Sequence, residues 1–121
     1  MYKLSMINNK RLPFLQCIAN GSKKAECRIA SDYIRSFKVG GGLLLYSGRE
    51  FTVCEITFLH FYKSFEDMLS AEGVENMVPF AKSFEGALEI YKSFPGAKRV
   101  ESQGCVAIGV KCIRSKLKFT I

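Results

Sequence analysis

GSKKAECR, residues 21–28, places a glycine and four charged residues within eight positions. Side chains of a β-strand alternate between its two faces, so a strand through this stretch carries Lys24, Glu26 and Arg28 on one face. The alanine and the cysteine between them then face the other way, toward a core. The glycine is typical of the residue that ends a helix. We therefore expect a helix, a turn and then a strand whose charged face borders a cleft or solvent.

The apolar pattern on either side of this stretch predicts a mixed order of strands and helices. Strands are expected over residues 2–7, 24–30, 43–46, 51–62 and 105–112, with a further edge strand over 116–121. Helices are expected over residues 13–20, between Ser64 and Gly73, and between Ser83 and Pro95. Scattered glycine turns, one early helix and a later helical insertion favour an α+β fold, a small mixed β-barrel with helices packed outside it.

The length and apolar content of the chain are sufficient for one packed core. With 121 residues, of which 48% are hydrophobic, a single domain over residues 1–121 is expected. The sequence contains no apolar run of about 18 residues, and its first residues lack the pattern of a signal peptide. We expect an intracellular protein, cytoplasmic or nuclear, with no membrane partner.

The cysteines and the single histidine do not form the pattern of a metal site. Five cysteines lie at wide, unequal spacings, and His60 is the only histidine. Structural zinc sites combine closely spaced cysteine and histidine pairs, which this sequence lacks. We expect reduced thiols inside the core, no metal and no cofactor.

The net charge of +7 is concentrated toward the two ends of the chain. Residues 1–49 contain nine Lys and Arg against two acidic residues, and residues 96–121 contain six against one. If the ends pair in space, their charges form one positive surface that attracts phosphates. Lys116 and Lys118 are then expected to contact the phosphates of an RNA. The alternative is a solvated lysine surface that only aids solubility.

The turn after the third expected strand offers a further pair of candidate ligand-binding residues. Tyr46 and Arg49 flank a Ser-Gly pair there. An aromatic ring and a guanidinium can stack on a planar ligand or hold it between them. A plain turn without a ligand is the alternative.

Five motifs together resemble the pattern of a known family. They are G-x-K-x-x-E-x-R (21–28), F-K-V-G (37–40), Y-K-S-F-E-D-M-L-x-x-E-G (62–73), S-F-E-x-A-L (83–88) and G-C-V-A-I-G-V (104–110). In this order and spacing they are similar to the ASCH domains of the PUA-like superfamily, over roughly residues 2–113. The remaining residues, 114–121, form a basic C-terminal strand or tail.

The resemblance implies a β-barrel with outer helices and a cleft lined by the G-x-K-x-x-E-x-R strand. Members of the family are thought to bind RNA or nucleotide-like ligands, and some small bacterial members are amidohydrolases that deacetylate acetylcytidine. In those enzymes a Lys and a Thr of the motif act with a later Glu. Lys23 matches the Lys and Glu75 matches the Glu, whereas Glu26 occupies the position of the Thr. A carboxylate cannot supply an alkoxide nucleophile, so Glu26 would instead act as a general base toward water.

We therefore expect binding of RNA or of a nucleotide-like ligand in a cleft around Lys23, Glu26 and Arg28. The guanidinium supplies a planar fork of donors, and the carboxylate accepts from an exocyclic amine. Three alternatives stay open: an amidohydrolase acting on a modified cytidine, an adaptor that binds another protein, and a structural role in which the carboxylate and the guanidinium only bridge each other.

Overall fold

One five-stranded sheet forms the frame of the molecule. The structure is a computed structural model that describes residues 1–118. The strands are β1 (Tyr2–Ser5), β2 (Ala25–Ile29), β3 (Gly42–Ser47), β4 (Glu50–Tyr62) and β5 (Cys105–Lys116). They lie in the order β1-β3-β4-β5-β2, and only the β1–β3 pair is parallel. Consequently β1 and β2 are the two edges of the sheet.

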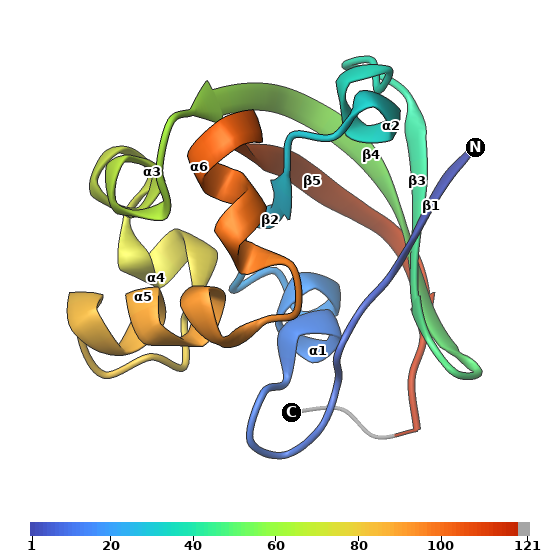
Figure 1. Ribbon diagram of the computed structural model, residues 1–121. Coiled ribbons are helices and arrows are strands. Elements are labelled where there is room, and N and C mark those ends of the chain that lie inside the picture. The colour runs from blue at the N-terminus through green and yellow to red at the C-terminus, as the bar shows by residue number, and fades with distance from the viewer. Residues whose placement is uncertain (119–121) are drawn as a thin grey trace.

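The sheet curls into a half-barrel, and the helices pack around it (Figure 1). The two longest strands, β4 and β5, pair antiparallel along most of their length. The register of that pair shifts between Val53 and Cys54 and again between Ile56 and Phe58. Such bulges bend a strand and increase its twist. The expected small mixed β-barrel with outer helices is therefore confirmed in the form of a curled half-barrel.

The helices include the three that the sequence predicts and several shorter ones. They are α1 (Phe14–Ala19), α2 (Asp32–Arg35), α3 (Phe65–Glu72), α4 (Val74–Met77), α5 (Phe84–Ser93), the 3-10 helix η1 (Ala97–Arg99) and α6 (Val100–Gln103). The hydroxyls of Ser64 and Ser83 cap α3 and α5, accepting from the backbone N–H groups of Asp67 and Gly86. The four-residue helices escaped prediction because one helical turn is too short to show a period.

The core lies between the inner face of the sheet and helices α1, α3, α4 and α5 (Figure 1). Strand β3 shows how the sheet is divided, because Leu43 and Leu45 are fully buried while Leu44 and Tyr46 point to the outer face. This alternation is the one expected of a strand with only one face against a core. The outer face of the sheet is therefore available for other contacts.

The expected edge strand over 116–121 is wrong where the structure describes it. Strand β5 is continuous as far as Lys116, which pairs with Phe51 of β4, and β5 lies inside the sheet between β4 and β2. Because β4 extends far enough to pair with it, β5 continues past Cys112 as far as Lys116. Residues 119–121 of that expected strand lie outside the described residues.

None of the helices between residues 1 and 118 is both long enough and apolar enough to cross a membrane.

Candidate functional site

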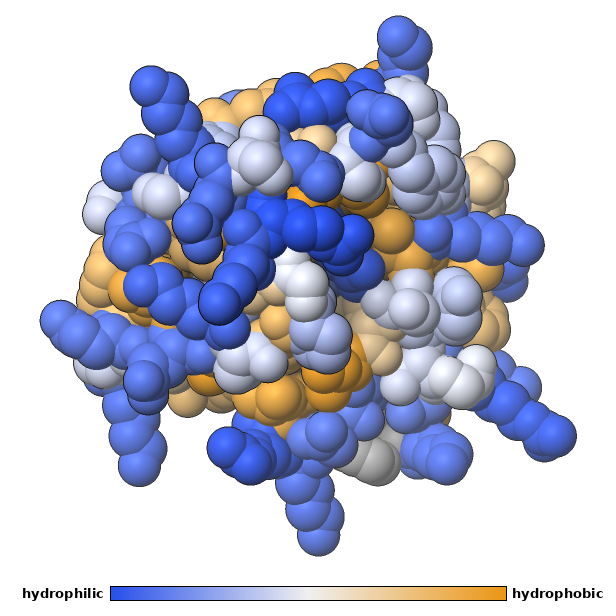
Figure 2. All heavy atoms as spheres, viewed as in Figure 1, coloured by the Kyte–Doolittle hydropathy of each residue, from blue (hydrophilic) through white to orange (hydrophobic). Residues whose placement is uncertain are grey.

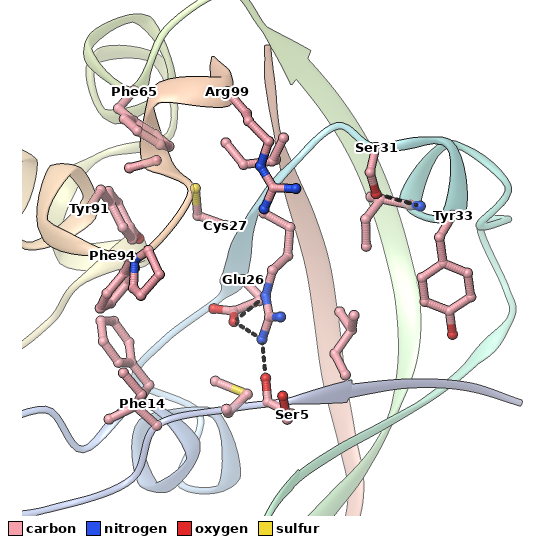
Figure 3. Close-up of a pocket in the computed structure, with 18 residues that line it drawn as sticks. Ser5, Phe14, Glu26, Cys27, Ser31, Tyr33, Phe65, Tyr91, Phe94 and Arg99 are labelled. Carbon is pink, nitrogen blue, oxygen red and sulfur yellow. Dashed lines mark hydrogen bonds and ion pairs between the residues drawn. The ribbon is translucent and has the colours of Figure 1, made fainter. Parts of the chain in front are cut away.

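A cleft opens between β1 and β2, the two edge strands of the curled sheet (Figure 3). Its volume is about 570 Å³. Polar groups of β1 and β2 line one side, and aromatic rings from the helices line the other. On the face that contains β2, strongly hydrophilic atoms lie beside hydrophobic ones near the centre (Figure 2). We call this space the β1–β2 cleft.

Two charged residues of β2 bridge each other and reach across the cleft to β1. The Arg28 Nε–H donates to Glu26 Oε2 at 3.0 Å, and Arg28 Nη2 lies 2.9 Å from the same oxygen. Arg28 Nη2 also donates to the backbone carbonyl of Ser5 (Figure 3). The Arg28 side chain thus connects the two edges of the half-barrel, β1 and β2, which do not pair through their backbones among the described residues.

Lys23 lies behind this pair and does not line the cleft. Its side chain is fully buried, and its ammonium donates to the carbonyl of Met77 and lies 3.5 Å from Glu26 Oε1. Burial lowers the pKa of Lys23, and the carboxylate of Glu26 opposes that shift. The expectation that Lys23 reaches a ligand from the turn is therefore corrected. Its backbone N–H donates to Cys17 of α1, which directs the side chain inward beneath α4.

Glu26 consequently has a cation on each side. Its side chain is only 8% exposed, with Lys23 against one oxygen and Arg28 against the other. Two opposite charges compensate for the cost of burying a carboxylate. The bridge between Glu26 and Arg28, one of the alternatives expected from the sequence, is present. An open cleft lies beside this pair.

Aromatic rings form the wall opposite the charged strand. The rings belong to Phe14 of α1, Phe65 of α3, Tyr91 of α5 and Phe94 just after α5. Phe94 meets Tyr91 and Phe14 edge to face, at centroid distances of 6.4 and 5.9 Å. Burial raises the pKa of Tyr91, so its hydroxyl stays protonated. Tyr91 is buried in the core, and the same ring also lines the cleft.

Arg99 is the cleft residue that sequence reasoning missed. It is exposed at the end of η1, and its Nε–H donates to the carbonyl of Gly96. Figure 3 shows Arg99 and Ser5 on opposite sides of Glu26. No motif marks Arg99, because it belongs to a turn that reaches the cleft only through the packing of α5. The cleft therefore holds two guanidinium groups and one carboxylate.

Lys24, the third charged residue of the β2 stretch, and Glu75, which the resemblance assigns to catalysis, lie away from the cleft. Lys24 is exposed, and Glu75 is exposed on α4. Neither residue lines the cavity. The three residues that the resemblance assigns to catalysis are thus not gathered around one open space: Glu26 faces the cleft, Lys23 lies buried behind it, and Glu75 faces outward.

Tyr46 and Arg49 lie together in a second hollow on the outer face of the sheet. This hollow, of about 560 Å³, is also lined by Lys3, Phe51 and Arg114, and we call it the outer-sheet hollow. The basic ends of the sequence do meet here, as the charge pattern predicts.

Lys116 and Lys118 do not line the outer-sheet hollow. Lys116 is exposed and lies beside the hollow, because it pairs with Phe51, which lines the hollow. Lys118 uses its backbone N–H, which donates to the carboxylate of Glu50 at 2.7 Å.

Within the described part of the chain, no group of three His, Cys, Asp or Glu side chains is arranged to hold a metal ion. The five cysteines are free thiols, with Cys27 in the wall of the β1–β2 cleft.

Two solved structures have the same fold. The crystal structure of hypothetical protein PH0355 superposes with a TM-score of 0.80 at 28% sequence identity, covering 93% of this chain and 98% of that one. The solution structure of protein PF0455 from Pyrococcus furiosus gives a TM-score of 0.73 at 27% identity, covering 93% and 96%. Neither name states a ligand or an activity. No protein-family model and no curated protein matches the sequence.

Proposed function

We propose that this protein is an ASCH-type domain that binds a nucleotide-like ligand, free or as one nucleotide of an RNA, in the β1–β2 cleft. The observation that carries the proposal is the composition of one cavity. A carboxylate and two guanidinium groups stand opposite a wall of four aromatic rings. A nucleotide has the same division, with a flat base that stacks, base edges that donate and accept, and a phosphate.

The size and lining of the cleft suit a small planar ligand. Ligand cavities are typically about 300–1,000 Å³ and mostly apolar with a few polar groups, and this one measures about 570 Å³. Phe94, the half-buried ring of the aromatic wall, offers a stacking surface for a base. The Glu26 carboxylate can accept from an exocyclic amine. Arg28 Nη1 has no hydrogen-bond partner among residues 1–118, so its donors can meet a ligand.

Arg99 is the residue that we assign to the phosphate. It is exposed at the rim of the cleft, and none of the ion pairs among the described residues involves it. Arginine recognises phosphate through paired donors. The neighbouring Lys98 is also exposed but does not line the cleft, which makes it a matched control.

Calorimetric and NMR titrations with CMP, AMP, GMP and UMP, and with the matching nucleosides, test the proposal. Arg99→Ala is expected to weaken nucleotide binding about tenfold, since a charge-assisted hydrogen bond contributes about 1.5–3 kcal/mol. The same change should leave nucleoside binding nearly unaltered, and Lys98→Ala should alter neither. Absence of binding by every nucleotide, or equal effects of the two substitutions, would contradict the proposal.

The Glu26 carboxylate also supports the amidohydrolase alternative. It faces the cavity and lies 3.5 Å from an ammonium whose pKa is lowered, an arrangement that can hold a general base for water. Incubation with acetylcytidine tests this, with cytidine release expected from the wild type and lost in Glu26→Gln. Glu75→Gln should keep the activity, because that side chain lies outside the cleft. If the wild type releases no cytidine, this activity is excluded. If the protein also binds no nucleotide, the adaptor function is favoured.

A further inference from the structure

The outer-sheet hollow lies on the face of the sheet that is turned away from the core. Leu43 and Leu45 of β3 are buried inside, so the intervening Leu44 and the following Tyr46 face outward. The hollow is built on these outward positions and on those opposite them in β4, Val53 and Phe51. In Figure 1 the β3–β4 hairpin is well separated from α5 and α6. The hollow is thus a surface separate from the β1–β2 cleft.

Strand register arranges the side chains of the hollow in two rows. One row crosses four strands as Lys3, Leu44, Val53 and Arg114, and the next runs through Tyr46, Phe51 and Lys116. Neighbouring strands are about 4.8 Å apart, so the two cations of the first row are separated by about 14 Å across an apolar centre. Cations therefore border a strip that contains two adjacent aromatic rings.

The cations that line the hollow, and Lys116 beside it, have no acidic partners in the described part of the chain. The ion pairs among residues 1–118 do not involve Lys3, Arg49, Arg114 or Lys116. The one carboxylate in the lining, Glu50, is only 8% exposed and accepts from Asn8 and from the Lys118 backbone. The described residues of this surface thus carry excess positive charge, which attracts anions.

The aromatic residues of the hollow present open ring surface. Tyr46 is 37% exposed and lies directly opposite Phe51 in the ladder. The Arg114 guanidinium lies over the Phe51 ring, 5.8 Å from its centroid. Base–aromatic stacking accepts every base, and a guanidinium over a ring extends the stacking surface.

We propose that the outer-sheet hollow binds single-stranded nucleic acid, whose bases stack on Tyr46 and Phe51 while Lys3, Arg49 and Arg114 hold its phosphates. Stacking rings beside a groove of unpaired cations form the arrangement by which proteins bind single strands without a fixed sequence. An acidic peptide would use the cations but leave the rings without flat partners. This surface acts independently of the ligand proposed for the β1–β2 cleft.

Fluorescence anisotropy of labelled ten-nucleotide RNA and DNA strands on the full chain tests this proposal. Tyr46→Leu is expected to weaken binding about tenfold through lost stacking. Phe61→Leu is the matched control, because Phe61 is 45% exposed but lies outside the hollow. Comparing RNA with DNA then shows which strand the surface prefers.

The charge requirement is tested through the salt dependence of the same measurement. Each lost phosphate contact should lower the slope of log affinity against log salt by about 0.7, so Lys3→Ala with Arg114→Ala should lower it by about 1.4. Lys98→Ala, which removes one cation from a position outside the hollow, should change the slope by less than Lys3→Ala or Arg114→Ala does alone. Thermal melts of each variant confirm that it is folded.

Three outcomes would overturn the proposal. They are no binding of either strand at low salt, equal weakening by Tyr46→Leu and Phe61→Leu, and equal slope changes from the hollow and from Lys98. Because Arg99→Ala acts only in the cleft, loss of mononucleotide binding with intact strand binding separates the two sites.

Discussion

The β1–β2 cleft and the outer-sheet hollow use similar residues in opposite ways. At the cleft, Arg28 is 27% exposed and Lys23 lies fully buried behind it, and both are bound to Glu26. In the hollow, Lys3 and Arg114 are exposed and without acidic partners among the described residues. Charges in the cleft are therefore part of the folded structure as well as of a site. Charges in the hollow contribute little to folding and remain available to a partner.

Buried charges must be paired, because an isolated ion in a core loses its hydration. That requirement makes the cleft sensitive to the loss of any one member of its network. Exposed cations keep their water, so removal of one of them affects binding far more than folding. The following predictions test this difference, beginning with the largest effect.

Removing the central charge of the cleft should cause the largest loss of stability. Glu26→Gln leaves the ammonium of Lys23 buried without a counter-charge, and such a change costs about 3 kcal/mol of unfolding free energy. Urea denaturation measures it. Glu55→Gln, at an exposed position of β4, should change stability by less than about 0.5 kcal/mol. Equal effects of the two changes would show that the network is not needed for folding.

The tie between the two edges of the sheet should contribute a smaller amount. Arg28→Ala removes the hydrogen bonds to Glu26 and to the carbonyl of Ser5, at a cost of about 1–2 kcal/mol because the side chain is partly exposed. Arg49→Ala, in the hollow, should cost less than about 0.5 kcal/mol. The comparison fails if the two arginines are equivalent in denaturation experiments.

The buried lysine should make stability depend on pH. The pKa of Lys23 is lowered by burial in the folded state, so below the ordinary value of 10.5 the unfolded chain holds this proton more tightly. Stability therefore rises with pH as the pH passes from the lowered pKa toward 10.5. Burial raises the pKa of Cys27 and so acts in the opposite direction at high pH, which makes a reference variant necessary.

Lys23→Met is that reference, since it keeps the volume and removes the titrating group. The difference in unfolding free energy between wild type and Lys23→Met, measured by urea denaturation across this pH range, should shift in favour of the wild type as pH rises. A difference that stays constant with pH would mean that the lysine is not desolvated.

The smallest effect is expected from the outer face of the sheet. Lys3→Gln with Lys116→Gln should leave the melting temperature unchanged or slightly raised, because neighbouring cations repel each other. Thermal melts at low and high salt measure this, and the difference should disappear at high salt. A clear loss of stability would show that these lysines have structural partners.

Much of the fold could be predicted from local patterns in the sequence. The apolar patterns over 105–112 and before Pro95 predicted β5 and α5, because the periods of strands and helices are local properties of the backbone. Ser64 and Ser83 mark the starts of α3 and α5, and such caps can be predicted because a capping side chain acts on its own helix. The four-residue helices and the full length of β5 were not predicted, because they depend on the neighbouring segments that pack or pair with them.

The sequence by itself determined that a strand with Glu26 and Arg28 follows a helix and a glycine turn, since backbone alternation and turn chemistry are local. Only the tertiary structure decided that Lys23 is buried, that Arg99 joins the cleft and that Glu75 does not. Those positions depend on the sheet order, which makes β1 and β2 the open edges, and on the packing of α4 and α5 over them. Contacts between distant segments are set by the core as a whole, and no short motif records them.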